Sequence, residues 1–141
     1  MFRKFALSAL IFLFVASCTK SQDRVVTLQK ETTLSIIKPD AVGNNYIGRI
    51  IAKLESQGLR VAAIKMKHLT EAQAKDFYKI HQSKPFYNDL ASFISSGPIV
   101  ALVLEGDNAI SKNRAIMGAT DPQKALTGTI RREFAESMSK K

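Results

Sequence analysis

Three stretches of the chain carry the apolar patterns of β-strands. Residues 34–37 form a short apolar run that ends at Lys38-Pro39, as a buried strand does. Residues 60–67 alternate between two sets of side chains, which is typical of a strand with two different faces. Residues 99–104 are apolar without interruption, as in a strand covered on both faces. We therefore predict that 99–104 is the central strand of a sheet.

Helical periodicity marks the segments between these strands. Apolar residues recur at helical spacing over residues 46–57, which predicts an amphipathic helix that ends at Gly58. Thr70 is a favourable N-cap for a second helix, which reaches His81. Shorter helices are predicted at residues 89–95, 108–116 and 131–137.

The order strand, helix, strand, helical insert, strand, helix predicts an α+β domain with helices over one face of the sheet. The chain has 141 residues, of which 45% are hydrophobic and 23% are charged, so it can form the core of one domain. Cys18 is the single cysteine, which excludes an internal disulfide.

The net charge of +9 favours anionic partners, such as nucleotides, nucleic acid or acidic lipid. The sequence has no basic run interleaved with aromatic residues and no zinc-ligand spacing. Nucleic acid is therefore not a predicted partner.

Residues 1–17 have the layout of a secretory signal peptide. A positive start at Arg3 and Lys4 precedes an apolar run over residues 5–16, which is too short for a transmembrane helix. Two small residues precede Cys18, and this arrangement resembles a bacterial lipobox, in which the cysteine is lipidated after cleavage. We expect a signal peptide at 1–17, a polar tether at 18–31 and the folded domain at 32–141.

Lipidation of Cys18 would anchor the protein to a membrane, on the periplasmic or cell-surface side. The alternative is a mis-called start codon, with translation beginning near Thr32 and a cytoplasmic protein as the product.

Residues 113–122 and 128–134 surround a loop punctuated by glycine and proline. Arg114 and Arg131 each offer a planar fork of charge-assisted donors that fits phosphate oxygens. Thr120 adds a hydroxyl group, and glycine lets the backbone approach a ligand closely. The combination predicts a polyphosphate site, and the alternative is an ordinary solvated loop between helices.

These residues resemble the nucleoside diphosphate kinase family. The resemblance rests on Asn-Arg-x-x-Met-Gly-Ala-Thr-Asp-Pro at 113–122, Gly-Thr-Ile-Arg at 128–131 and Thr-Leu-Ser-Ile-Ile-Lys-Pro-Asp-Ala-Val at 33–42. Between them, in the family's order, lie Phe-Tyr at 77–78, Lys-Pro-Phe-Tyr at 84–87 and Ser-Gly-Pro at 96–98. The family implies a ferredoxin-like βαββαβ core, whose fourth strand is expected after Lys141 and is missing from this chain.

The resemblance also implies a reaction. Members of this family transfer the γ-phosphate of a nucleoside triphosphate such as ATP to a nucleoside diphosphate, in a ping-pong reaction with Mg²⁺ on the phosphates. By resemblance, Arg114, Thr120 and Arg131 contact the phosphates. Lys38 reaches the ribose and the terminal phosphate. Phe86 stacks on the base, and this stacking accepts any base because every base has a π-face.

The family's nucleophile is a histidine in a His-Gly-Ser-Asp motif, which Tyr78 would help to orient. Lys141 falls at the position of an asparagine that precedes this motif, so the histidine is expected a few residues beyond the chain. His68 and His81 stand where the family has histidines that are not catalytic. A covalent mechanism needs its nucleophile, so we predict weak nucleotide binding at most and negligible turnover.

Two other interpretations remain open. The chain is either a catalytically inactive, lipid-anchored nucleotide-binding or assembly protein, or a degenerate and poorly folded product. In the first case it would complete its site by pairing with an intact kinase subunit, because the family forms homo-oligomers. A missing edge strand would also expose a sheet edge to pairing with other chains.

Overall fold

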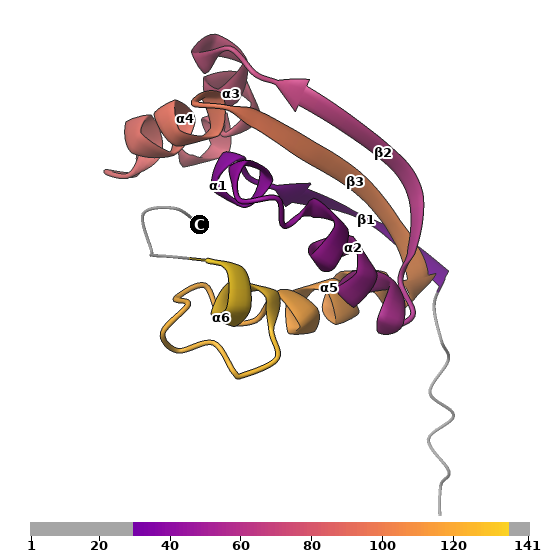
Figure 1. The fold of residues 1–141 in the computed structure, drawn as a ribbon. Helices are drawn as coiled ribbons and strands as arrows, with labels where there is room; N and C mark the ends of the chain where they lie inside the picture. The colour runs from indigo at the N-terminus through magenta and orange to yellow at the C-terminus, as the bar shows by residue number, and fades with distance from the viewer. Residues whose placement is uncertain (1–29, 136–141) are drawn as a thin grey trace, which may run out of the picture.

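The computed structural model describes residues 30–135 of the chain (Figure 1). Its sheet has three antiparallel strands, β1 (Lys30–Ile37), β2 (Arg60–His68) and β3 (Pro98–Asp107), in the order β1-β3-β2. The three predicted strands are confirmed, and the apolar run at 99–104 lies in the central one. β1 starts at Lys30 rather than Leu34, because its polar first half pairs with the last residues of β3.

Helices fill the connections between the strands. The segment between β1 and β2 contains α1 (Pro39–Gly43) and α2 (Ile47–Ser56). The insert between β2 and β3 contains α3 (Glu71–Phe77), the 3-10 turn η1 (Lys79–His81) and α4 (Tyr87–Ser95). After β3 come α5 (Ala109–Met117) and α6 (Ile130–Phe134).

Two helix predictions need correction at their ends. Thr70 caps α3 as predicted, in a capping box with Gln73, but α3 ends at Phe77 and only the short turn η1 reaches His81. The helix predicted at 131–137 is observed as α6, which starts one residue earlier and ends at Phe134, because Ala135 is extended; residues 136 and 137 lie outside the described residues.

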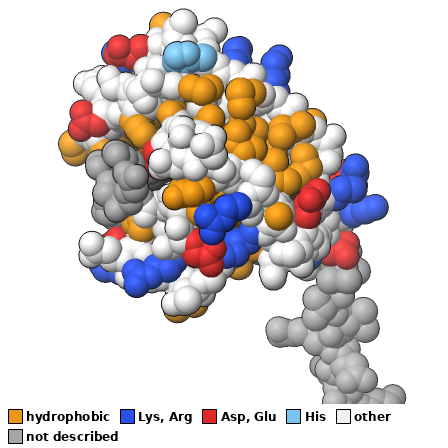
Figure 2. Space-filling view, viewed as in Figure 1, with side chains coloured by type: hydrophobic (Ala, Val, Ile, Leu, Met, Phe, Trp, Pro, Cys, Tyr) orange, Lys and Arg blue, Asp and Glu red, His pale blue; other side chains and the backbone are white. Residues whose placement is uncertain are grey.

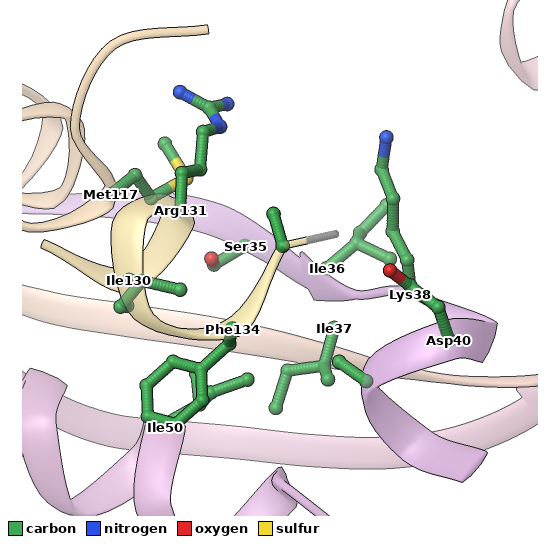
Figure 3. A pocket seen from close by; sticks show the side chains of 12 residues that line it. Ser35, Ile36, Ile37, Lys38, Asp40, Ile50, Met117, Ile130, Arg131 and Phe134 are labelled. Atoms are coloured by element: carbon green, nitrogen blue, oxygen red, sulfur yellow. The ribbon is translucent and has the colours of Figure 1, made fainter. Parts of the chain in front are cut away.

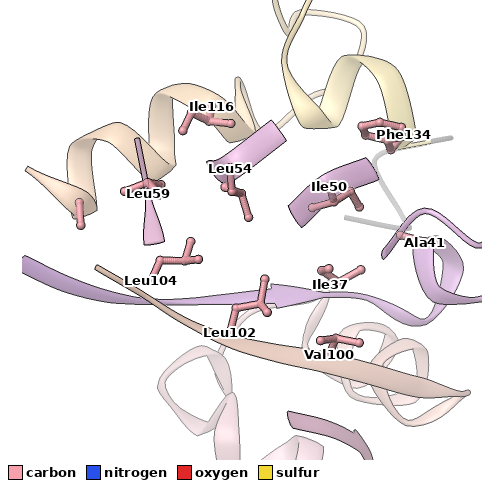
Figure 4. Packing of buried hydrophobic residues seen from close by; sticks show 11 residues of the cluster. Ile37, Ala41, Ile50, Leu54, Leu59, Val100, Leu102, Leu104, Ile116 and Phe134 are labelled. Atoms are coloured by element: carbon pink, nitrogen blue, oxygen red, sulfur yellow. The ribbon is translucent and has the colours of Figure 1, made fainter. Parts of the chain in front are cut away.

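The main core lies on the face of the sheet that α2, α5 and α6 cover (Figure 1). Val100, Leu102 and Leu104 of β3 are buried on this face, and Ile37 of β1 lies opposite Val100 in the strand register. Leu54 of α2 is fully buried among them (Figure 4). This packing confirms the predicted α+β class, and the helices of the main core lie on one face of the sheet.

A smaller cluster packs on the opposite face, at one end of the sheet. There α3 and α4 bring Ala74, Ala91 and Ile94 against Ile99 of β3. The remainder of this face is uncovered within residues 30–135, and Leu34 is 51% exposed. Figure 2 shows hydrophobic side chains gathered at the surface over the sheet.

Within residues 30–135, no helix has the length and apolar composition that crossing a bilayer requires. The predicted signal peptide and Cys18 lie outside the described residues. The predicted tether at 18–31 lies outside them too, except for Lys30 and Glu31, which belong to β1.

Candidate functional site

A cavity of about 100 Å³ lies where β1 ends, between α1 and α6 (Figure 3). Most of its lining is apolar and comes from the end of β1, from α1 and α6, and from one residue each of α2 and α5. Its polar lining residues are Ser35, Lys38, Asp40 and Arg131. Two cations, one carboxylate and one hydroxyl group therefore line a cavity whose other walls are apolar, and its net positive charge favours an anionic ligand.

Lys38 lies at the junction of β1 and α1. Pro39 follows it as the first residue of α1, where the missing N–H of proline costs no hydrogen bond. The Lys38 side chain is partly buried, and its Nζ lies 5.8 Å from the ring centroid of Phe93 in α4. Figure 3 shows Lys38 and Arg131 on opposite sides of the cavity. The fold thus brings together two predicted site residues from opposite ends of the described chain.

Arg131 reaches the cavity from α6. Its Nη1 donates a hydrogen bond of 2.6 Å to the carbonyl oxygen of Gly118. Burial lowers the pKa of Arg131 below its ordinary value, because the charged guanidinium loses hydration, but arginine keeps its charge at neutral pH even so. A guanidinium has five N–H donors, so the bond to Gly118 leaves others for an anion.

Aromatic and charged residues fix α6 to α2. The Phe134 ring is buried, with its centroid 5.1 Å from that of Tyr46. The guanidinium of Arg49 lies 4.8 Å from the Phe134 ring centroid. Lys53 Nζ and Glu133 Oε1 form an ion pair at 2.6 Å. These contacts hold in place the helix that carries the arginine of the cavity.

Arg114 and Thr120 do not line this cavity. Arg114 is exposed in the last turn of α5, and Thr120 is exposed in the loop at 118–129. Both side chains are accessible from solvent. Their contact with phosphate stays a prediction.

The predicted aromatic residues lie on the segment from α3 to α4. Phe86 is 50% exposed, and its ring centroid lies 5.8 Å from that of His81. Tyr78 is partly buried, and burial raises its pKa above the ordinary value because the charged phenolate would lose hydration. It lines a separate hollow with Leu34 and Lys65, rather than the cavity of Lys38. The predicted role of Tyr78 in orienting a histidine stays a prediction.

Neither histidine lines the cavity of Lys38 and Arg131. His68 ends β2, and its Nε2 lies 2.9 Å from the carbonyl oxygen of Ser95, so this nitrogen carries the hydrogen and donates it. His81 lies in η1, between the rings of Tyr78 and Phe86.

Two polar residues, Asp40 and Asn113, were not predicted as functional residues. Asp40 lines the cavity, and its place two residues after Lys38 was the available signal. Asn113 is 3% exposed, and its Oδ1 has no hydrogen-bond partner in the described part of the chain. Its position directly before Arg114 was the signal there. No three His, Cys, Asp or Glu side chains of residues 30–135 are grouped to hold a metal ion.

The fold and the cavity together define an α+β domain with a basic cavity at the end of its first strand. A sequence profile described as "Nucleoside diphosphate kinase" matches residues 31–141. The chain is 64% identical to "Nucleoside diphosphate kinase 1" of Protochlamydia amoebophila over 113 aligned residues, and this alignment covers 80% of each chain. It is 54% identical over 113 residues to "Nucleoside diphosphate kinase" of Anaeromyxobacter sp., which covers 80% of this chain and 77% of that protein.

Solved structures agree with these sequence matches. The nucleoside diphosphate kinase of Aquifex aeolicus superposes with a TM-score of 0.77 at 39% identity, over 79% of this chain and 82% of that one. The enzyme of Halobacterium salinarum, solved in complex with CDP, has a TM-score of 0.76 at 40% identity, over 79% of this chain and 74% of that one. The chain therefore belongs to the nucleoside diphosphate kinase family, and the ferredoxin-like fold class is confirmed.

Proposed function

We propose that this chain binds nucleoside di- and triphosphates at the cavity of Lys38 and Arg131. The convergence of these two cations on one cavity carries the proposal. Arg114 and Thr120 extend the phosphate contacts onto the exposed end of α5. The half-exposed Phe86 stacks on the base. The CDP complex of the Halobacterium salinarum relative supports this assignment.

The size of the cavity limits how much of the ligand it can enclose. Small-molecule sites usually measure roughly 300–1,000 Å³, well above the volume found here. Only the phosphate end of a nucleotide therefore enters the cavity of about 100 Å³. The ribose and base lie outside it, on the surface that leads to Phe86.

The reaction that we propose for the family site is transfer of the γ-phosphate of ATP to a nucleoside diphosphate through a phosphohistidine. The names of the relatives support this reaction. Neither His68 nor His81 lines the cavity, so within residues 30–135 no histidine is placed to accept a phosphate. We therefore expect this chain to bind nucleotide without forming the phosphoenzyme.

Mg²⁺ fits this site as a companion of the phosphates. Mg²⁺ is usually bound through substrate phosphates, water and one or two carboxylates, and Asp40 is the carboxylate that lines the cavity. The ion would neutralise charge on the phosphate oxygens when the nucleotide is bound. Lys38 and Arg131 would share this work by holding the phosphates from two sides.

Incubation of the purified full chain with γ-labelled ATP tests this proposal. We expect measurable ATP binding by calorimetry and no acid-labile label on the protein. A labelled histidine would contradict the expectation that this chain lacks a nucleophile. Failure to bind ATP in a chain that melts cooperatively would contradict the nucleotide site itself.

The second candidate function is a catalytically inactive, lipid-anchored protein that binds nucleotide or assembles with an intact kinase subunit. The absence of both described histidines from the cavity favours it. The intact kinase subunit would then supply the missing chemistry. Mixing the chain with an active relative and measuring co-elution and activity distinguishes this function from simple binding.

We propose a membrane location through lipidation of Cys18, on the periplasmic or cell-surface side. Cys18→Ser is expected to move the protein from the membrane fraction to the soluble fraction, because the thiol that carries the acyl chains is lost. Immunoblotting of fractionated cells measures this change. A wild-type protein found in the soluble fraction would favour the cytoplasmic alternative, with translation from a later start.

A further inference from the structure

Gly118 has a backbone conformation that only glycine adopts readily. It ends α5 with φ +81° and ψ −178°. In this region a side chain would clash with the neighbouring peptide groups, so residues other than glycine are essentially absent from it. The conformation determines where the carbonyl oxygen of Gly118 points.

That carbonyl oxygen is the acceptor for Arg131. The bond from Arg131 Nη1 measures 2.6 Å, and it joins the end of α5 to α6 across the loop at 118–129. The N–H of Gly118 bonds to the carbonyl oxygen of Arg114 at 3.1 Å, as the last hydrogen bond of α5. Gly118 therefore links the two helices that carry the proposed phosphate-binding arginines.

The space beside Gly118 is filled by Thr129, the residue directly before α6. A Cβ atom at position 118 would lie 2.5 Å from Thr129 Oγ1 and 2.6 Å from Thr129 Cβ. Thr129 cannot easily move away, because its hydroxyl donates to Leu126 O at 2.7 Å and its backbone N–H donates to the same oxygen at 3.1 Å. Any side chain at 118 must therefore shift either the Gly118 peptide or the start of α6.

We propose that Gly118 is a positioning residue for the nucleotide site, which fixes the Arg131 guanidinium toward the phosphates through its carbonyl oxygen and its close contact with Thr129. This inference rests on the proposed nucleotide binding. Arg131 is held on one side by this bond and lines the cavity on the other. Gly118 itself touches no phosphate and acts through Arg131.

Gly118→Ala tests the inference by calorimetry with ATP and with AMP. We expect the affinity for ATP to fall about tenfold, the effect of roughly one misplaced charge-assisted bond, and the affinity for AMP to change less than about threefold. In an Arg131→Ala background, Gly118→Ala should cause no further loss, because the two residues act on one interaction. Equal losses for ATP and AMP, or additive effects in the double variant, would overturn the inference.

Two further variants keep the test decisive. Gly58→Ala introduces the same kind of positive-φ strain, since Gly58 has φ +79°, but a Cβ there meets only the flexible end of Lys112, with Nζ at 3.6 Å. It should leave ATP affinity within about threefold of wild type. Thr129→Val places a methyl group against an unchanged Gly118 and should lower ATP affinity a few-fold, even if Gly118→Ala does not fold.

The outcomes separate the inference from the function it rests on. A wild-type chain that does not bind ATP contradicts the proposed function. A wild-type chain that binds ATP, with Gly118→Ala or Thr129→Val equally tight, contradicts only the positioning role. Thermal melting of each variant identifies those that have lost the fold.

Discussion

Arg131→Ala is expected to weaken ATP binding by roughly 30- to 150-fold, which corresponds to about 2–3 kcal/mol. The guanidinium lines the cavity across from Lys38, and it is already oriented by its bond to Gly118. Removing a charge-assisted hydrogen-bond donor from a partly buried position lowers the binding free energy more than removing an exposed donor. Arg131→Lys keeps the charge but not the planar fork, so its affinity should fall between those of wild type and Arg131→Ala. Calorimetric titration with ATP measures both variants.

Arg132→Ala is the matched control for this prediction. Arg132 is the next residue of α6, and its Nη1 makes only long bonds of 3.4 Å to the carbonyl oxygens of Pro122 and Gln123. It does not line the cavity. We expect its replacement to change ATP affinity less than about threefold, as surface substitutions usually do. Equal effects of the two replacements would mean that general positive charge, rather than Arg131, attracts the nucleotide.

Phe134→Ala is expected to lower the free energy of unfolding by about 3–5 kcal/mol. The ring is 7% exposed and belongs to the main core, so its removal loses buried apolar area and leaves a cavity. It also removes one of the two cation–π partners of Arg49 within the described residues, whose guanidinium lies 4.8 Å from the Phe134 ring centroid and 5.5 Å from that of Tyr46. Urea denaturation followed by circular dichroism measures the change. ATP affinity should fall as well, because α6 carries Arg131.

Phe77→Ala, which removes a half-exposed ring, is the comparison for the loss of stability expected in Phe134→Ala. Phe77 ends α3, is 50% exposed and packs edge-on against Tyr78 at 4.8 Å between centroids. Its replacement should cost about 1 kcal/mol, since less area is buried and the ring contact is worth about that much. If Phe134→Ala were no more destabilising than Phe77→Ala, the docking of α6 on α2 would not be a main source of stability.

The strands and the capped helix could be predicted because they depend on neighbouring residues. The uninterrupted apolar run at 99–104 is itself the pattern of a central strand, which β3 is, between β1 and β2; Thr70 caps α3 through residues within one turn. The polar first half of β1 could not be predicted in this way. Lys30 and Glu31 form strand because they pair with Asp107 and Gly106, far along the chain.

The same distinction holds for the candidate site. The sequence predicted Arg114 and Arg131 as site residues, because the planar guanidinium fits phosphate oxygens, and Lys38 through the resemblance to the family. The motifs did not predict that Tyr78 faces a different hollow, on the side of the sheet that α3 and α4 cover only in part. The direction of the Tyr78 side chain depends on how α3 and α4 pack against β3, and the local sequence does not determine this packing.

The sequence by itself determined the family, the order of strands and helices, and the residue types that suit a phosphate, since these follow from motifs and local periodicity. Only the tertiary structure decided that Lys38 and Arg131 share one cavity, because sheet pairing and the docking of α6 on α2 bring distant residues together. It also decided that His68 and His81 lie away from that cavity. The close contact between Gly118 and Thr129 is likewise formed only when the loop at 118–129 folds and brings these two residues together.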